Sequence, residues 1–231
     1  VANIEDEATG TLTITGSAAE GGTLGTSFSP SDADGSVSTS YQWQVSSDGS
    51  SWSDLNSNAS SSNYSLASDQ TDVGKFFRVV AVTTDPFGGT TSFTSSATSA
   101  VSNVNDVASG TVTISGTATE DQVLTASNNL SDLDGLGTIG YQWVRAGSDI
   151  SGATSSTYTL TQSDVGSVIT VKASYTDALG SSESVTSSAT SAVANIEDEA
   201  TGTLTITGSA AEGGTLGTSF SPSDADGSVS T

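Results

Sequence analysis

Short runs in which apolar and polar residues alternate recur along the chain. TLTIT at 11–15 places its leucine and isoleucine on one face and its threonines on the other, and this period of two predicts a half-buried strand. YQWQV at 41–45 and FFRVVAVTT at 76–84 are rich in the aromatic and β-branched residues that strands favour. TSFTSSATSAV at 91–101 predicts a weaker strand. No stretch carries a convincing helical stripe, and turn-forming groups such as SDADGS and TDPFGG separate the runs, so the pattern predicts an all-β fold.

The same strings return at regular offsets along the chain. GTLTITG at 10–16 returns as GTVTISG at 110–116, and residues 1–39 are identical to residues 193–231. YQW, S-D-x-D-G, D-V-G and SSATSAV recur in the same order. The chain is therefore a tandem array with a period of 192 residues, and we interpret it as a window of a longer one. We predict the end of a preceding unit and a linker at 1–9, repeat A at 10–105, repeat B at 106–197, and the N-terminal fragment of another repeat A at 198–231.

Each repeat predicts a β-sandwich, because about seven short strands fall within about 95 residues. A tryptophan on the third long strand, Trp43 or Trp143, precedes an Asp-x-Gly at 72–74 or 164–166. This arrangement resembles an immunoglobulin-type domain, in which such a corner leads into strand F. The chain has no cysteine, so the core must form without a disulfide, which a domain of this size can do. We expect tandem immunoglobulin-like β-sandwich domains without disulfides, arranged as an elongated array. The expected core residues are the two tryptophans, the valine-rich strand F, and Leu24, Leu124, Leu66 and Leu160.

Charge narrows the possible partners. The chain carries 26 acidic and 4 basic residues, a formal net charge of −22. Four basic residues cannot build a nucleic-acid groove, and no apolar run approaches the ~18 residues of a membrane span. Histidine and cysteine are absent, which excludes a Ser-His-Asp triad and thiolate chemistry, and we predict no enzymatic activity. Carboxylates are hard oxygen ligands that suit Ca²⁺, so we predict calcium as the bound ion.

The junctions between repeats carry the densest groups of oxygen-bearing side chains. SNVND at 102–106 joins repeats A and B, and ANIEDE at 194–199 and 2–7 occupies the corresponding places. These segments resemble cadherin-type calcium linkers. A Ca²⁺ ion that takes 6–8 oxygens from a linker and its flanking domains would fix the angle between them, whereas the alternative is a solvated polar linker. The candidate ligands are Asn3, Glu5, Asp6, Glu7, Asn103, Asn105, Asp106, Asn195, Glu197, Asp198 and Glu199.

A second candidate motif is the Asp-x-Asp-Gly loop, which occurs at 32–35, 132–135 and 224–227. Its spacing matches the start of an EF-hand loop, but no glutamate follows at the twelfth position. An Asx-turn with glycine at positive φ is the stronger interpretation, although a loop that faces the junction would still donate oxygens. The same two interpretations apply to Glu20 and Glu120. The candidate ligands from this motif and its surroundings are Asp32, Asp34, Asp85, Asp132, Asp134 and Asp177.

The repeated motifs together resemble a known family. The run G-T-[LV]-T-I-[TS]-G, S-D-x-D-G, Y-Q-W, T-Y-T-L-T-x-S-D-V-G and Y-T-D-x-x-G is clearest at 110–193. It is similar to the Ig-like tandem extender repeats of giant bacterial RTX-type and biofilm-associated surface adhesins. This resemblance implies an extracellular place on the bacterial cell surface, neighbouring repeats of the same chain as partners, and stiffening by calcium. Two alternatives stay open: a carbohydrate- or surface-binding module that uses an exposed Trp52 in the longer loop at 46–63, and a self-assembling fibre of several copies.

Overall fold

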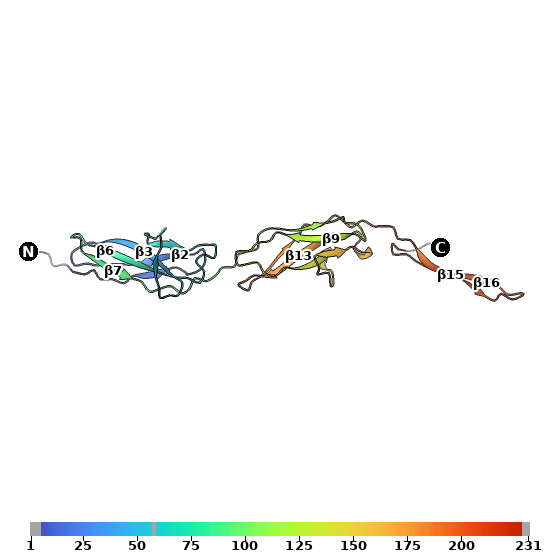
Figure 1. The fold of residues 1–231 in the computed structure, drawn as a ribbon, viewed down its shortest axis with the longest axis horizontal. Coiled ribbons are helices and arrows are strands. Elements are labelled where there is room, and N and C mark those ends of the chain that lie inside the picture. The colour runs from blue at the N-terminus through green and yellow to red at the C-terminus, as the bar shows by residue number, and fades with distance from the viewer. Residues whose placement is uncertain (1–5, 57–58, 228–231) are drawn as a thin grey trace, which may run out of the picture. The chain divides into compact units, whose positions relative to one another are not determined.

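The computed structural model describes residues 6–56 and 59–227 (Figure 1). The chain divides into two compact units, Val1–Asp106 and Val107–Thr231. Two of the predicted calcium ligands, Asn3 and Glu5, lie outside the described residues.

The first unit is built from two antiparallel sheets. One sheet has the order β1-β2-β5 and the other has the order β4-β3-β6-β7. The two long strands pair over nine residues, with Trp43 of β3 opposite Val79 of β6. The strands are β1 (Thr13–Thr15), β2 (Thr23–Ser27), β3 (Ser38–Ser46), β4 (Ser53–Asp54), β5 (Asn63–Ser65), β6 (Phe76–Thr84) and β7 (Thr90–Thr94).

The second unit repeats this plan and adds a hairpin. Its sheets have the orders β12-β9-β8 and β11-β10-β13-β14, and β15 pairs with β16 alone. The elements are β8 (Val112–Ser115), β9 (Val123–Asn128), β10 (Gly140–Arg145), β11 (Ser148–Asp149), β12 (Thr157–Thr159), the 3₁₀ turn η1 (Gln162–Asp164), β13 (Ile169–Thr176), β14 (Ser182–Thr186), β15 (Thr201–Gly208) and β16 (Leu216–Ser223). The predicted all-β fold without disulfides is confirmed.

Each sandwich has a core at the predicted positions. Trp43 and Trp143 are fully buried, and each indole N–H donates to a backbone carbonyl, that of Ser61 or Ser155, at 2.9 Å. Alternate residues of the long strands β6 and β13 face inward, as a period of two requires. The four core leucines expected from the sequence, Leu24, Leu66, Leu124 and Leu160, are all buried.

The Asp-x-Gly corner of repeat B is tied down by hydrogen bonds. The buried Asp164 carboxylate accepts from the Tyr158 hydroxyl at 2.8 Å and from the backbone N–H and hydroxyl of Thr161, both at 2.9 Å. Arg145 forms an ion pair with the same carboxylate at 3.1 Å. Asp72 holds the matching corner of repeat A, where its carboxylate accepts from the backbone N–H of Ala67. These aspartates therefore have a structural role.

The predicted strand at 91–101 differs from the one observed. Regular pairing of β7 with β6 ends at Thr94. Beyond it, the Ser95 hydroxyl accepts from the Val79 N–H, and the Thr98 hydroxyl accepts from the Phe77 N–H, both at 3.0 Å. Side-chain oxygens here replace the backbone carbonyls of a regular ladder. The second unit repeats this arrangement through the Ser187 and Thr190 hydroxyls.

The hairpin β15–β16 has the same sequence as the β1–β2 region of repeat A but a different structural environment. Leu204, Ile206 and Leu216 are 65%, 75% and 55% exposed, although the identical positions Leu12 and Leu24 in repeat A are buried. This hairpin pairs over eight residues, whereas β1 and β2 pair over three. The apolar face that repeat A buries inside its sandwich is thus exposed on the hairpin.

Among the residues that the structure describes, no helix has the length and apolar character needed to cross a membrane.

Candidate metal centres

The junction after repeat B brings three carboxylates together. One oxygen from each of Glu120, Asp198 and Asp226 lies within 4.8 Å of the others, and we call these three residues the junction cluster. Glu120 lies in the turn before β9, where its backbone N–H donates to the Ala194 carbonyl at 2.9 Å. The Asp198 N–H donates to Asp226 Oδ2 at 2.6 Å. The linker is thereby held both to the body of repeat B and to the S-D-x-D-G loop that follows it.

A glutamine amide lies beside the Glu120 carboxylate. With its amide oriented to donate, Gln162 Nε2 is 2.7 and 2.9 Å from Glu120 Oε1 and Oε2, and 3.3 Å from Asn195 Oδ1. The Ile196 N–H also donates to Glu120 Oε2, at 3.3 Å. Glu120 is 4% exposed, so these donors stabilise a charge that burial would otherwise destabilise.

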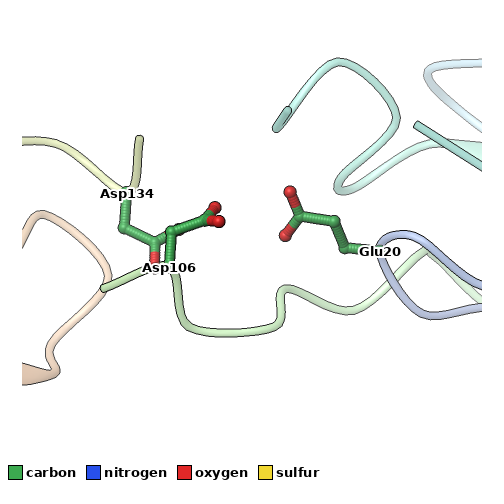
Figure 2. Close-up of side chains that lie close together, drawn as sticks. All are labelled: Glu20, Asp106 and Asp134. Carbon is green, nitrogen blue, oxygen red and sulfur yellow. The ribbon is translucent and has the colours of Figure 1, made fainter. Parts of the chain in front are cut away.

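Repeat A builds the same arrangement at the matching positions. Gln70 Nε2 donates to Glu20 Oε2 at 3.1 Å, to Asn103 Oδ1 at 2.6 Å and to Asp106 Oδ2 at 3.4 Å. The Val104 N–H donates to Glu20 Oε2 at 3.2 Å. Figure 2 shows the Glu20 and Asp106 carboxylates pointing toward each other, with one oxygen of each within 4.8 Å. Asp134, also labelled there, belongs to the second unit.

The S-D-x-D-G loop of repeat A forms a separate group of carboxylates. One oxygen from each of Asp32, Asp34 and Asp85 lies within 4.8 Å of the others. Asp32 Oδ1 accepts from the Asp34 N–H at 2.8 Å, which is the expected Asx-turn. Asp34 Oδ2 accepts from the Asp6 N–H at 3.0 Å, so the linker before repeat A contacts this loop just as Asp198 contacts Asp226.

The corresponding loop of repeat B has an additional partner. The Tyr175 hydroxyl donates to Asp132 Oδ2 in a short hydrogen bond, and Asp132 Oδ1 accepts from the Asp134 N–H at 2.9 Å. Burial and the Asp132 carboxylate raise the pKa of Tyr175 well above its usual range. The matching position in repeat A is Thr83.

Asp177 lies in the turn after β13 and is 5% exposed. Its Oδ1 accepts from the backbone N–H groups of Leu179 at 2.8 Å and Ser181 at 2.9 Å. Burial acts to raise the pKa of this carboxyl, but the backbone N–H groups of the turn outweigh burial and the pKa is lowered. Asp177 is therefore ionised at neutral pH.

Some of the predicted ligands have carboxylate oxygens that lie close together in the structure, and others do not. Asp32, Asp34 and Asp85 meet, Asp198 meets Asp226, and Asp106 faces Glu20. Within the described ranges, the groups of three close carboxylates do not include Asp6, Asp132 or Asp177, nor do they include the exposed residues Glu7, Glu197 and Glu199. Asn103 and Asn195 lie beside the glutamine amides, and the Asn105 amide donates to the Asp106 carbonyl at 3.3 Å.

Sequence reasoning missed three kinds of residue at these sites. It left open whether Glu20 and Glu120 are solvated surface residues or metal ligands, although each lies at the centre of its group. It did not consider Gln70 and Gln162, which stand 92 residues apart, the offset that also relates the linkers. That shared offset was the available signal. Tyr175 carried no such signal, because repeat A lacks it.

Trp52, which the carbohydrate-binding alternative requires to be exposed, is half-buried. The Arg78 guanidinium lies 4.4 Å from the centre of its ring. Arg78 Nε in turn donates to Gln44 Oε1 at 2.7 Å. One ring face is therefore covered by a cation–π contact.

Comparison with known proteins finds structural matches only. No protein-family model matches the chain, and no curated protein matches it. Among 31 matching chains of solved structures, one is from a 1.5-MDa bacterial ice-binding adhesin, with 15% identity, a TM-score of 0.32, and coverage of 88% of this chain and 70% of that one. A Ca²⁺-stabilised adhesin with which an Antarctic bacterium binds ice has 19% identity, a TM-score of 0.33, and coverage of 87% and 52%.

A third match is a tetra-tandem repeat from the extending region of a large adhesion protein, with 15% identity, a TM-score of 0.26, and coverage of 94% of this chain and 63% of that one. These structural matches extend across most of the chain. The aligned region spans 52% to 70% of the length of the matched chains. The three matched proteins are described as adhesins or as an adhesion protein.

Proposed function

We propose that this chain is a segment of the extender region of a repetitive bacterial surface adhesin or filament, and that Ca²⁺ bound at the junctions stiffens it. The observation that carries the proposal is the junction cluster of Glu120, Asp198 and Asp226, together with the matching group of Glu20, Gln70, Asn103 and Asp106. The role is mechanical and extracellular: the repeats are spacers without catalytic activity.

The electrostatics of the junction cluster favour a divalent cation. Three carboxylate oxygens lie within 4.8 Å of one another, and two like charges at that distance repel by about 3.5 kcal/mol at an effective dielectric constant of about 20. The chain has only 4 basic residues to offset its 26 acidic ones. A Ca²⁺ ion, which takes 6–8 oxygen ligands, would turn this repulsion into attraction and would join the linker to both of its neighbours.

The repeat architecture supports the mechanical role. Stability in a tandem array is the sum of terms for the repeats and terms for their interfaces, so an ion at each junction acts on the whole array. One of the matched adhesins is described as Ca²⁺-stabilised, which agrees with calcium as the ion proposed here. The carbohydrate-binding alternative has weaker support, because Arg78 covers one face of Trp52.

Thermal melting in the presence and absence of calcium tests the proposal. The chain in excess CaCl₂ should melt at a higher temperature than in EDTA, because an ion that binds only the folded state stabilises it by mass action. MgCl₂ at the same ionic strength is the control, since Mg²⁺ demands a tighter octahedral site and sheds its water reluctantly. Equal melting temperatures in CaCl₂ and EDTA would reject the calcium part of the proposal.

A further inference from the structure

A glutamine amide nitrogen lies among the oxygens of the junction after repeat B. In its donating orientation, Gln162 Nε2 is 2.7 and 2.9 Å from the two Glu120 carboxylate oxygens and 3.3 Å from Asn195 Oδ1. A Ca²⁺ ion that binds one carboxylate through both oxygens lies at a similar place, at nearly equal distances from the two. The amide therefore occupies space that an ion bound to Glu120 would need.

The junction after repeat A has the same arrangement. Gln70 Nε2 donates to oxygens of Glu20, Asn103 and Asp106 at distances of 3.1, 2.6 and 3.4 Å. An amide nitrogen has two N–H groups, so they are shared among three oxygens. Gln70 and Gln162 each stand two residues before the aspartate of the Asp-x-Gly corner. The contact recurs at matching positions of two divergent repeats, so it is a feature of the repeat design.

The backbone of Gln70 is strained in a way that serves this contact. Its φ angle is 64°, in the left-handed region that residues other than glycine rarely adopt. In this conformation its backbone N–H donates to Glu20 Oε1 at 3.0 Å while its side chain donates to Oε2, so one residue binds both carboxylate oxygens. Backbone strain of this kind persists where the surroundings enforce it, and it is concentrated at functional sites.

The two glutamates need such donors because no basic side chain balances them. Glu20 and Glu120 are 9% and 4% exposed, and among the described residues no lysine or arginine forms an ion pair with either. A buried carboxylate is stable only with hydrogen-bond donors or a cation beside it. In the absence of an ion, the glutamine amides supply part of what a cation would supply.

We propose that Gln70 and Gln162 take the place of the ion while the junctions are empty, and that an arriving Ca²⁺ displaces them. An amide donates hydrogen bonds but carries no net charge, so it relieves the repulsion between the carboxylates only in part and a divalent cation can replace it. This inference rests on the junction calcium proposed above, and it adds a residue that sets the calcium concentration at which each junction fills.

The displacement has a consequence that can be measured. If the amide stabilises only the ion-free state, the stability lost on its removal without calcium must reappear as calcium affinity, because the coupling between two interactions is reciprocal. A hydrogen bond to a charged group changes an equilibrium constant by about 10- to 100-fold. Each glutamine should therefore raise the calcium concentration that its junction requires by about tenfold.

Two substitutions of Gln162 separate the amide from the ion, with stability of repeat B measured by amide exchange and calcium binding to the full chain by calorimetry. Gln162→Met keeps the length of the side chain without its donors, so it should be less stable than the wild type in EDTA and should bind one Ca²⁺ about tenfold more tightly. Gln162→Lys places a permanent positive charge beside Glu120, so it should be more stable in EDTA and should bind one Ca²⁺ fewer.

The matched controls are Gln122→Met and Gln122→Lys, which make the same changes at an exposed glutamine of repeat B and should leave stability and calcium binding unchanged. In saturating calcium Gln162→Met should be as stable as the wild type, whereas a general fold defect would lower stability in both conditions. Gln70→Met should repeat the result of Gln162→Met at the other junction.

Weaker calcium binding by Gln162→Met than by the wild type would overturn the inference, because the amide would then be a ligand or would hold the ligands ready for the ion, and the proposed function would stand. Equal stability of Gln162→Met and the wild type in EDTA would overturn it as well. A wild type that binds no calcium would reject the proposed function and, with it, the displacement of the amide.

Discussion

Replacement of Glu120 by glutamine should change stability in opposite directions with and without calcium. The substitution keeps the size of the side chain and removes one of three charges whose oxygens lie within 4.8 Å of one another. In EDTA the variant loses repulsion from Asp198 and Asp226, each worth between about 1 kcal/mol in bulk water and about 3.5 kcal/mol at a dielectric constant of about 20. The neutral side chain forms weaker hydrogen bonds with Gln162, which offsets part of this gain. We expect E120Q to be more stable than the wild type in EDTA by roughly 1 kcal/mol.

In calcium the order should reverse. Extracellular calcium modules bind with dissociation constants of about 10⁻⁴ to 10⁻³ M. Ca²⁺ at 100 times the dissociation constant stabilises the folded state by about 2.7 kcal/mol, and E120Q should lose most of this because it has lost its most buried ligand. Amide hydrogen exchange over residues 107–194, measured in EDTA and in CaCl₂, reports on repeat B separately from repeat A. Glu183→Gln, in the edge strand β14, serves as the control.

A loss of stability in both conditions would refute this reasoning. It would show that the Glu120 charge supports the fold through its backbone and Gln162 partners, and that no ion is needed to balance the three carboxylates. A variant that equals the wild type in both conditions would show that the carboxylates do not interact.

Three other outcomes follow from the structure. Burial acts to raise the pKa of Asp164, but the hydrogen bonds to its carboxylate outweigh burial and lower the pKa. The stabilisation that the ionised carboxylate provides is therefore present above pH ~4 and is lost as the pH falls through the lowered folded-state pKa. D164N should cost about 1–3 kcal/mol of stability at pH 7, and in a urea-denaturation series at different pH values it should flatten the fall in stability toward acid pH. Ser187→Ala leaves the buried Val171 N–H without its acceptor and should cost about 1–3 kcal/mol in the same assay, whereas Ser187→Thr should restore most of it. Fusion of a copy of residues 40–101 after the last residue should bury Phe220 and the rest of the β15–β16 apolar face, seen as slowed amide exchange of β15; unchanged exchange would contradict the comparison with repeat A.

Much of the fold could be predicted from the sequence because burial follows local pattern. The alternation in 76–84 indicates which side chains of β6 face inward. Trp43 and Leu24 are large apolar residues, which are favoured in the core over a solvent-exposed position. The segment 95–101 could not be predicted as it is, because its hydroxyls act as acceptors for β6 only once the partner strand is in place. Pairing of this kind depends on tertiary contacts that a local pattern does not contain.

The candidate sites were predicted in part for the same reason. Linker residues such as Asp198 stand out because acidic residues cluster in a short segment. Glu120 and Gln162 are isolated in sequence, and only the packing of the turn before β9 against η1 and the linker brings them together. Tyr175 is one residue in an apolar strand, where its ring predicts core packing, and its hydroxyl contact with Asp132 becomes visible only when the loop is placed.

Stiffening of the chain by calcium at the junctions can be measured by small-angle X-ray scattering. Profiles of the same sample are recorded in excess CaCl₂, after EDTA, and after calcium is restored. We expect EDTA to shorten the maximum dimension and to add the scattering signature of a flexible linker, and we expect restored calcium to reverse both changes. Identical profiles in calcium and EDTA, from a sample that remains folded by circular dichroism, would contradict this expectation.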